Sequence, residues 1–444
     1  MERIQAKTLP GFMELLPNEQ ILFNQMKQKI QQVYEKYGFL PIDTPVIEAA
    51  EVLLAKAGGE TEKQIYRFNK GENDLALRFD LTVPLAKYVS LYYHSLNFPF
   101  KRYQIGKVYR GEKAQKGRYR EFYQCDIDII GDNELNIIHD AEIPSIIYDT
   151  FNELGFKKFT ICINNRKILN GIFEALELTN NSVEIMRIID KIEKIGKENI
   201  IKELENLGIS KEKINTIMNL ILFNGTTDEK LKILEEISID NEIFNQGKEE
   251  LKKVVEYIRM FNIPDNNFTV DFTIARGLDY YTGTVYETFL DDYKKLGSVC
   301  SGGRYDNLAD YYTDKKLPGV GISIGLSRFF YQLKEENIIK EDKCSVSEVM
   351  VIPMNKEFKE CIEIANILRK NNINVDIYLE DKKIKNKFKY TDKLQIPYAI
   401  VIGEDEIKNK IVSFKNMITG EQENLTIEQV IEKIKSNKTK RSLI

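Results

Sequence analysis

Charged and aromatic side chains stand close together in a stretch that otherwise alternates as a β-strand does. Residues 107–122 read KVYRGEKAQKGRYREF and place Arg110 before a basic loop and Phe122 after it. An arginine that projects from a strand can hold a phosphate with its N–H donors, at about 1.5–3 kcal/mol per charged contact. An aromatic ring on the same hairpin could stack on a base. A solvated basic hairpin is the alternative, and this stretch alone does not decide between them.

A second polar stretch, ARGLDYYTGTVYE at 275–287, follows the alternating sequence FTVDFTI at 268–274. The alternation predicts a strand as far as Ile274 and places the polar stretch in the bend of a hairpin that leads to the next strand. Arg276 could hold an anion, and Tyr280 and Tyr281 could contact polar atoms of a ligand. Taken singly, the two tyrosines could equally be core aromatics.

Further polar residues fall on neighbouring strand-like segments. Gln124 and Asp128 are four residues apart in REFYQCDIDIIG, so that both project from one face of the predicted strand. Asp80 follows LALRF, and two glycines interrupt CSGGRYDNL. The acids could be ordinary strand-end residues and the glycines a simple turn, but the joint occurrence of all these features in one order favours a functional site.

Several of these motifs resemble the signatures of class II aminoacyl-tRNA synthetases. YRGE with RYREF is similar to the second motif of that class, GVGISIGLSRF to the third, and TPVIE around Pro45 to the first, which lies at a dimer interface. ARGLDYYTGTVYE and CSGGRYDNL resemble the paired signatures of the histidyl-tRNA synthetase family, and FDLTVPLAKY is also similar to it. The resemblance covers nearly the whole chain and includes KNKFKYTDKLQIPYAIVIGEDE, which is similar to the anticodon-binding domain.

The resemblance implies a homodimeric histidine–tRNA ligase. Such an enzyme activates histidine with ATP to histidyl-adenylate and pyrophosphate, then transfers histidine to the 3′-terminal adenosine of tRNA(His). Negative charge accumulates at the α-phosphate during activation, so fixed cations are needed there. The resemblance gives this catalytic role to Arg110 and Arg276. Mg2+ would accompany the ATP, with no metal site made by the protein itself.

The resemblance also implies which residues bind each substrate. For ATP they are Arg110 at the α-phosphate, Glu112 and Phe122 at adenine and Arg328 at the γ-phosphate. For histidine they are Asp80, Leu81, Thr82, Arg110, Gln124, Asp128, Arg276, Tyr280 and Tyr281. Asp80, Thr82 and Gln124 would take the α-ammonium group, Asp128 and Tyr281 would contact the imidazole, and Tyr280 would shape the pocket wall. Such a pocket rejects apolar amino acids, because its own polar groups would stay unpaired.

Two basic segments are candidates for tRNA contact. Gln115 and Arg118, in the loop after YRGE, would approach the acceptor end. Lys385, Lys387 and Lys389 lie in KKIKNKFKYTDK at 382–393, which has six lysines and one acid. Contacts of these lysines with phosphates would be salt-sensitive. A solvated helix face is the alternative interpretation of the charge pattern alone.

Two rival functions are weighed against this one. A non-catalytic, synthetase-like regulatory subunit of histidine biosynthesis keeps the fold but typically lacks the C-terminal domain and part of the catalytic set, and both are present here. A class II synthetase for proline or threonine is disfavoured by RGLDYYTG. The sequence departs from the third motif at Ser327, where glutamate usually precedes the arginine. A supporting contact is therefore missing or replaced.

The elements that must position these residues indicate an α/β (α+β) protein. We expect an antiparallel sheet of the class II synthetase type flanked by helices, with a helical insertion and a C-terminal α/β anticodon-binding domain. The expected boundaries are 1–165 for the first part of the catalytic domain, 166–260 for the insertion, 261–340 for the second catalytic part and 345–444 for the anticodon-binding domain. The insertion is predicted from long Ile/Leu/Glu/Lys periodicity.

Composition narrows the class of protein. The 444 residues are too many for one hydrophobic core, and 43% hydrophobic with 30% charged residues is typical of a globular protein. A net charge of −4 argues against indiscriminate nucleic-acid binding but permits a local basic surface. The five widely spaced cysteines, the lack of a signal peptide and the lack of a long apolar run favour a cytoplasmic protein without a membrane anchor.

Overall fold

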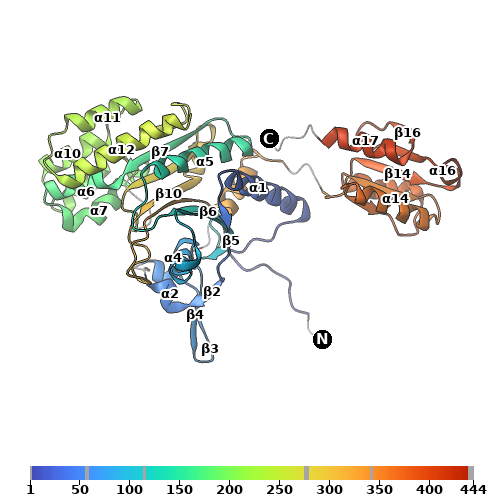
Figure 1. Cartoon of the computed structure of the whole chain (residues 1–444), viewed down its shortest axis with the longest axis horizontal. Coiled ribbons are helices and arrows are strands. Elements are labelled where there is room, and N and C mark those ends of the chain that lie inside the picture. The colour runs from blue at the N-terminus through green and yellow to red at the C-terminus, as the bar shows by residue number, and fades with distance from the viewer. Residues whose placement is uncertain (1–2, 56–59, 114–116, 275–279, 341–343, 439–444) are drawn as a thin grey trace. The chain divides into compact units, whose positions relative to one another are not determined.

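The computed structural model describes residues 3–55, 60–113, 117–274, 280–340 and 344–438 (Figure 1). Contacts divide the chain into two compact units, Met1–Met13 with Lys27–Glu336, and Glu14–Met26 with Asn337–Ile444. A search of the described residues finds no helix that is both long and apolar enough to cross a membrane. Each unit is built around its own sheet.

An eight-stranded sheet forms the centre of the first unit. Its order is β1 (Leu40–Pro41), β5 (Phe100–Tyr109), β6 (Glu121–Ile130), β11 (Gly319–Ile324), β10 (Cys300–Tyr305), β9 (Thr284–Leu290), β7 (Phe159–Asn165) and β8 (Phe268–Val270). All neighbours are antiparallel except the two outermost pairs, β1 with β5 and β7 with β8. The antiparallel sheet expected from the sequence is confirmed.

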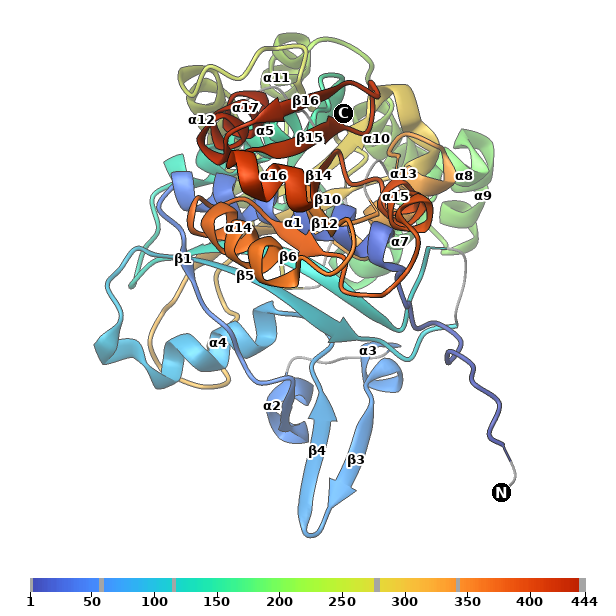
Figure 2. The ribbon, with the colours of Figure 1, turned by 90° about the vertical axis from the view of Figure 1, so that its right-hand side faces the viewer.

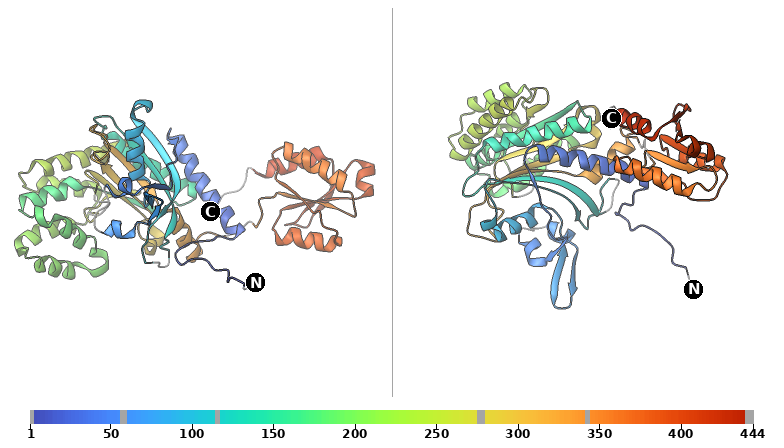
Figure 3. Two further views of the ribbon diagram at one scale, coloured as in Figure 1. Left: turned by 90° about the horizontal axis from the view of Figure 1, so that it is seen from below. Right: turned by 45° about the vertical axis from the view of Figure 1, so that its right-hand side comes forward.

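Helices cover one face of this sheet. The C-terminal part of α1 (Pro17–Lys36) meets β6 where the Tyr34 hydroxyl donates to the Cys125 carbonyl at 3.2 Å. α5 (Ile138–Leu154) meets β9 where the Tyr286 hydroxyl donates to the Asp140 carbonyl at 2.7 Å. α13 (Leu326–Glu335), which follows β11 directly, packs Phe329 near α5. The right-hand view of Figure 3 shows α1 and α5 on the same side of the sheet. The polar residues of β6 lie on the opposite face.

The helical insertion expected between the two parts of the sheet is present. It consists of α6 (Arg166–Ala175), α7 (Ser182–Ile189), α8 (Ile192–Ile195), α9 (Lys197–Asn206), α10 (Lys211–Ile221), α11 (Thr227–Glu236) and α12 (Glu242–Met260). α12 returns the chain to the sheet by packing against α6. A β-carbon at Gly171 would lie 2.4 Å from the backbone nitrogen of Phe244, so this close helix contact requires glycine.

A small sheet lies beside the main one in the first unit. It pairs β2 (Ile47–Ala49), β4 (Asn73–Leu77) and β3 (Arg67–Lys70), and Figure 2 shows β3 and β4 as a long hairpin. α2 (Ala50–Leu54) and α4 (Thr82–Leu91) pack against each other there, and α3 (Glu60–Gln64) precedes β3. The end of β4 leads through Asp80 into α4.

The predicted hairpin around ARGLDYYTGTVYE is wrong in its strand pairing. β8 ends at Val270 because the Asp271 carboxylate accepts hydrogen bonds from the Thr273 nitrogen at 2.9 Å and hydroxyl at 2.7 Å, which forms a turn. β7 then lies between β8 and β9, and β8 pairs with β7 in parallel. Residues 275–279 fall outside the described part of the chain, and β9 begins at Thr284.

The second unit is a five-stranded mixed sheet with helices, as the C-terminal pattern predicts. Its order is β13 (Val375–Ile377), β12 (Val349–Pro353), β14 (Tyr398–Ile402), β15 (Val412–Asn416) and β16 (Gln422–Leu425). The helices are α14 (Phe358–Lys370), α15 (Ile384–Lys393), α16 (Glu404–Asn409) and α17 (Ile427–Lys438). The α/β class of this unit is confirmed.

Candidate active site

A cavity of about 320 Å³ lies against the large sheet, with lining residues from β6, β9, β10, β11 and α13. Among its lining residues are seven of those predicted from the sequence: Arg110, Glu112, Arg118, Phe122, Gln124, Tyr281 and Arg328. They come from segments more than 200 residues apart in the chain. Folding therefore brings motifs that are far apart in the sequence into one site.

The strand register explains why these residues meet. Gln124, Asp126 and Asp128 alternate along β6 and share a face, as predicted for the first and last of them. Asp126 lies opposite Ser323 of β11, and Asp128 lies opposite Gly321. A β-carbon at Gly321 would lie 2.3 Å from an Asp128 carboxylate oxygen, so glycine leaves the room that this buried acid occupies.

Cations gather at one part of the cavity. Arg110 donates from Nε to the Phe79 carbonyl at 3.0 Å and lies over the Phe122 ring, 5.2 Å from its centre. Arg118 pairs with Glu112 at 3.3 Å. Burial, and then the positive charge of Arg118, lower the pKa of Arg328. Like charges this close repel one another unless an anion lies between them, so this region suits a polyanionic ligand.

Ser327 has a definite structural role. It is completely buried, and its hydroxyl oxygen accepts a hydrogen bond from the Tyr123 backbone nitrogen at 2.9 Å. This hydrogen bond connects α13 to β6. Its two residues, Tyr123 and Ser327, directly precede Gln124 and Arg328. We expected a supporting contact to be missing or replaced at Ser327. The structure shows a hydrogen bond at this position that links α13 and β6, the two elements that carry the site.

The deeper end of the site holds carboxylates whose oxygens are not all paired. One Asp80 oxygen accepts from the Val83 nitrogen at 3.1 Å, while Oδ2 is buried and has no partner among the described residues. Burial raises the pKa of Asp80 to about 6, although Arg110 and Arg102 oppose the shift. An unpaired buried acceptor of this kind suits a cationic ligand group.

The two tyrosines lie at this end as well. Tyr280 and Tyr281 pack edge to face with ring centres 5.0 Å apart, and Tyr280 hydrogen bonds to Thr82. Burial raises the pKa of both phenols, so they stay neutral hydrogen-bonding groups at physiological pH. Leu81 is fully buried, and its carbonyl accepts from Arg102 at 3.3 Å. The predicted histidine-binding residues are thereby brought together wherever the structure describes them.

Asp128 is held by two residues that were not predicted. Its carboxylate forms an ion pair with the fully buried Arg102 and accepts a hydrogen bond from the Tyr305 hydroxyl at 2.7 Å. Burial nevertheless raises the pKa of Asp128. Tyr305 lies within CSGGRYDNL, where a tyrosine after two glycines was a visible signal. For Arg102 there was no such signal beyond its position in a strand-like segment.

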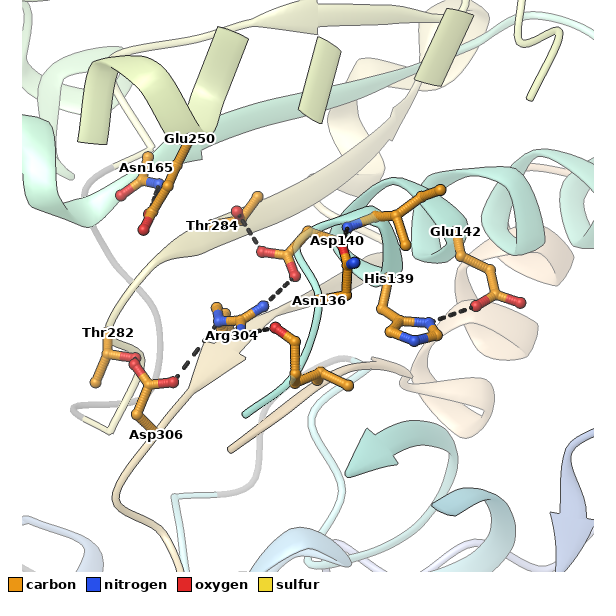
Figure 4. Close-up of polar contacts among 12 residues, drawn as sticks. Asn136, His139, Asp140, Glu142, Asn165, Glu250, Thr282, Thr284, Arg304 and Asp306 are labelled. Carbon is orange, nitrogen blue, oxygen red and sulfur yellow. Dashed lines mark hydrogen bonds and ion pairs between the residues drawn. The ribbon is translucent and has the colours of Figure 1, made fainter. Parts of the chain in front are cut away.

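A polar network on the helix-covered face fixes the strands behind the site (Figure 4). Arg304 forms an ion pair with Asp140 at 2.6 Å, and Asp140 also accepts from the Thr284 hydroxyl at 2.6 Å. The Thr282 hydroxyl donates to Asp306 at 2.5 Å, and the Thr282 nitrogen donates to the Arg304 carbonyl at 2.8 Å. These bonds anchor the residue next to Tyr281. None of them was predicted.

The remaining predicted residues lie elsewhere. Arg276 and Gln115 fall outside the described residues. Lys385 and Lys389 are exposed on α15. The structure contradicts the tRNA contact expected for Lys387, because this residue is only 1% exposed and its Nζ donates to the Pro353 carbonyl at 2.8 Å. Lys387 lies on the inner side of the helix, whereas the charge pattern alone did not distinguish the two sides.

Comparison with known proteins assigns both parts of the chain. Residues 11–329 match the family model of histidyl-tRNA synthetase, and residues 348–437 match that of an anticodon binding domain. A histidine–tRNA ligase of Clostridium tetani is 61% identical over 98% of this chain and 99% of its own length. One of Finegoldia magna is 48% identical over 97% of this chain and 100% of its own length.

Solved structures agree with the sequence matches. Histidyl-tRNA synthetase from Nostoc superposes with a TM-score of 0.91 at 38% identity, covering 98% of this chain and 100% of that one. A Bacillus halodurans protein described as an ATP phosphoribosyltransferase regulatory subunit/histidyl-tRNA synthetase gives 0.74 at 20% identity, covering 90% of this chain and 98% of its own, which shows a shared fold only. The cavity's residues, the family model over most of the chain and the high identity lead to one conclusion: the chain belongs to the histidyl-tRNA synthetase family.

Proposed function

We propose that this chain is a histidine–tRNA ligase, which makes histidyl-adenylate from histidine and ATP and transfers histidine to the 3′-terminal adenosine of tRNA(His). The observation that carries the proposal is a single site with two unlike ends. Arg110, Arg118 and Arg328 crowd one end, while unpaired acceptors of Asp80 and Gln124 lie at the other. ATP brings negative charge and histidine brings an ammonium group, so the two ends match the two substrates.

The chemistry proposed for the cationic end is adenylate formation. The histidine carboxylate attacks the α-phosphate, and pyrophosphate leaves. Arg110 is placed to hold the α-phosphate and the attacking carboxylate, because its guanidinium is fixed by the Phe79 carbonyl before any substrate arrives. Preorganised donors of this kind stabilise charge that develops in the transition state without reorganising. We assign Arg276 to the opposite side of the same phosphate, as the family resemblance implies.

Arg328 and the adenine site complete the ATP assignment. Arg328 would hold the γ-phosphate, and a bound phosphate would relieve its repulsion with Arg118. Phe122 would stack on adenine, with Glu112 accepting from the adenine amino group. Mg2+ would be held mainly by the phosphate oxygens and would neutralise part of their charge. The phosphate ligands predicted from the sequence, Arg110, Arg276 and Arg328, are all arginines.

Histidine selection is assigned to the buried end. Asp80, Thr82 and Gln124 would take the α-ammonium group, and Asp128 and Tyr281 would contact the imidazole. Arg102 and Tyr305 already hold Asp128 in place, so its remaining acceptor capacity is oriented before histidine binds. Tyr280 closes the wall against Tyr305, with ring centres 5.9 Å apart. An apolar amino acid would leave these groups unsatisfied.

The proposed function also involves contacts with tRNA, a second subunit and a location in the cell. Arg118 and Gln115 would approach the tRNA acceptor end, and Lys385 and Lys389 the anticodon stem. We expect a homodimer, supported by the exposed apolar residues Val46 and Ile47 in the segment that resembles the first motif. We place the protein in the cytoplasm because its five cysteines are all free thiols.

One assay tests the function directly. ATP–pyrophosphate exchange, measured with histidine, proline and threonine in turn, should proceed with histidine alone. A non-catalytic regulatory subunit would give no exchange with any of them. The absence of histidine-dependent exchange by folded protein would reject the ligase function, and exchange with proline or threonine would reject the substrate.

A further inference from the structure

A chain of hydrogen bonds runs across two strands beneath the ammonium site and ends at a residue that no step above uses. The Gln124 Nε2 group donates to the Ser323 Oγ atom at 2.8 Å. Ser323 in turn hydrogen bonds to the Asp126 carboxylate, which is only 2% exposed. Asp126 and Ser323 are directly opposite each other in the β6–β11 register. The three side chains therefore share one face of the sheet.

The order of donors in this chain is set by its last member. An ionised carboxylate only accepts hydrogen bonds, so the Ser323 hydroxyl must point its single proton at Asp126. The Ser323 oxygen is then left with lone pairs toward Gln124, and the amide must turn its NH2 group to them. The amide oxygen consequently faces away from Ser323.

The free end of the amide is the part that a substrate would meet. Gln124 lines the cavity, and its Oε1 atom is buried without a partner among the described residues. If the amide were rotated by half a turn, its NH2 group would occupy that position. Two donors would then face the ammonium group of histidine, and binding would lose an acceptor and gain a repulsion.

We propose that Asp126 and Ser323 are positioning residues that fix the orientation of the Gln124 amide, so that its oxygen is presented to the ammonium group of histidine. Neither residue touches the substrate. The inference rests on the proposed function, because it assigns the ammonium group to Gln124. It goes further by making recognition of that group depend on two residues behind the pocket.

The experiment measures exchange kinetics at pH 8 and inhibition by two analogues. Ser323→Ala removes the link, and Asp126→Asn keeps the shape but allows the bond to run in either direction. Both should raise KM for histidine about ten- to hundredfold, with kcat and KM for ATP within about threefold of wild type. Histidinol, which keeps the ammonium group, should bind correspondingly more weakly. Imidazole propionate, which lacks it, should bind unchanged.

A rescue and a matched control separate positioning from structural damage. Gln124→Glu in the Ser323→Ala background should recover much of the histidinol affinity, because both ends of a carboxylate are acceptors. Ser413→Ala removes a bond of the same kind in the second unit, where the Gln422 Nε2 group donates to a buried serine at 2.7 Å. It should change neither KM nor analogue affinity.

The outcomes distinguish this inference from the proposed function. Equal weakening of histidinol and imidazole propionate, or unchanged affinity for histidinol in both variants, would overturn the positioning role while wild-type exchange stays intact. A wild-type protein without histidine-dependent exchange would instead overturn the proposed function, and the positioning role with it.

Discussion

At the scale of single residues, the sequence predicted the side chains that line the cavity better than the side chains that hold them in place. Arg110 and Phe122 stand close together in one polar stretch, so their types and spacing were visible. Arg102 and Tyr305, which hold Asp128, are 26 and 177 residues away from it along the chain. Their contacts with Asp128 depend on the strand register, which cannot be derived from the sequence alone. Contacts formed only by folding are therefore the part that could not be predicted.

Arg328 provides a test of the cationic end of the cavity. Arg328→Ala should raise KM for ATP in the exchange reaction by about ten- to hundredfold, since a charge-assisted hydrogen bond is worth about 1.5–3 kcal/mol. KM for histidine should change far less, because the charges that Arg328 interacts with are those of Arg118 and Glu112, which belong to the cationic end. An equal rise in both constants would show that Arg328 supports the whole cavity instead.

Asp126 provides a test by pH. Burial raises its pKa in the folded protein from 3.8 to about 7, so between these values the folded state binds more protons than the unfolded state. Its contribution to stability is therefore present at low pH and is lost as the pH rises through about 7. Asp126→Asn removes this dependence. Urea unfolding should show the variant gaining stability relative to wild type on going from pH 5 to pH 8.

The control for this measurement is an acid whose pKa is lowered, not raised, in the folded protein. The hydrogen bond from Arg67 lowers the pKa of the exposed Asp74, so Asp74 titrates below pH 5 in both states. Asp74→Asn should give the same difference from wild type at pH 5 and pH 8. If Asp126→Asn also gave a constant difference, the raised pKa of Asp126 would be contradicted.

At the scale of elements, local pattern predicted strands and helices but not their neighbours. The helical insertion was predicted because its Ile/Leu/Glu/Lys periodicity is local to the segment. The hairpin at Ile274 was wrong because the Asp271 side chain ends β8 early and β7 takes the place beside β9. The strand order of the sheet is set by pairing between segments that are far apart in the sequence, such as β7 with β9. That order places Arg304 and Asp140 against each other behind the site.

The Arg304–Asp140 pair can be tested by removing one partner or both. Arg304→Met leaves the fully buried Asp140 carboxylate without its cation and should cost about 3–5 kcal/mol of unfolding free energy. Adding Asp140→Asn removes the uncompensated charge and should restore part of the loss. Arg67→Ala, which breaks an exposed ion pair with Asp74, should leave stability nearly unchanged in the same urea titration, because solvent screens exposed pairs.

At the scale of the whole molecule, a chain with net charge −4 must concentrate its cations wherever it meets a polyanion. The first unit gathers arginines around a cavity, and the second exposes lysines on α15. Amino-acid activation needs only the cavity, whereas charging of tRNA would use both units. The two activities should therefore respond separately to mutations in the second unit.

The double variant Lys385→Ala/Lys389→Ala tests this separation. It should weaken tRNA binding and reduce the slope of log affinity against log salt by about 1.5–2, because two phosphate contacts release fewer counterions. Histidine-dependent exchange should be unchanged. Lys387→Met is the matched control, since its amine is buried against the Pro353 carbonyl, and it should lower stability but leave the salt slope intact. A slope that falls with Lys387→Met, or stays constant in the double variant, would place the tRNA-binding surface elsewhere.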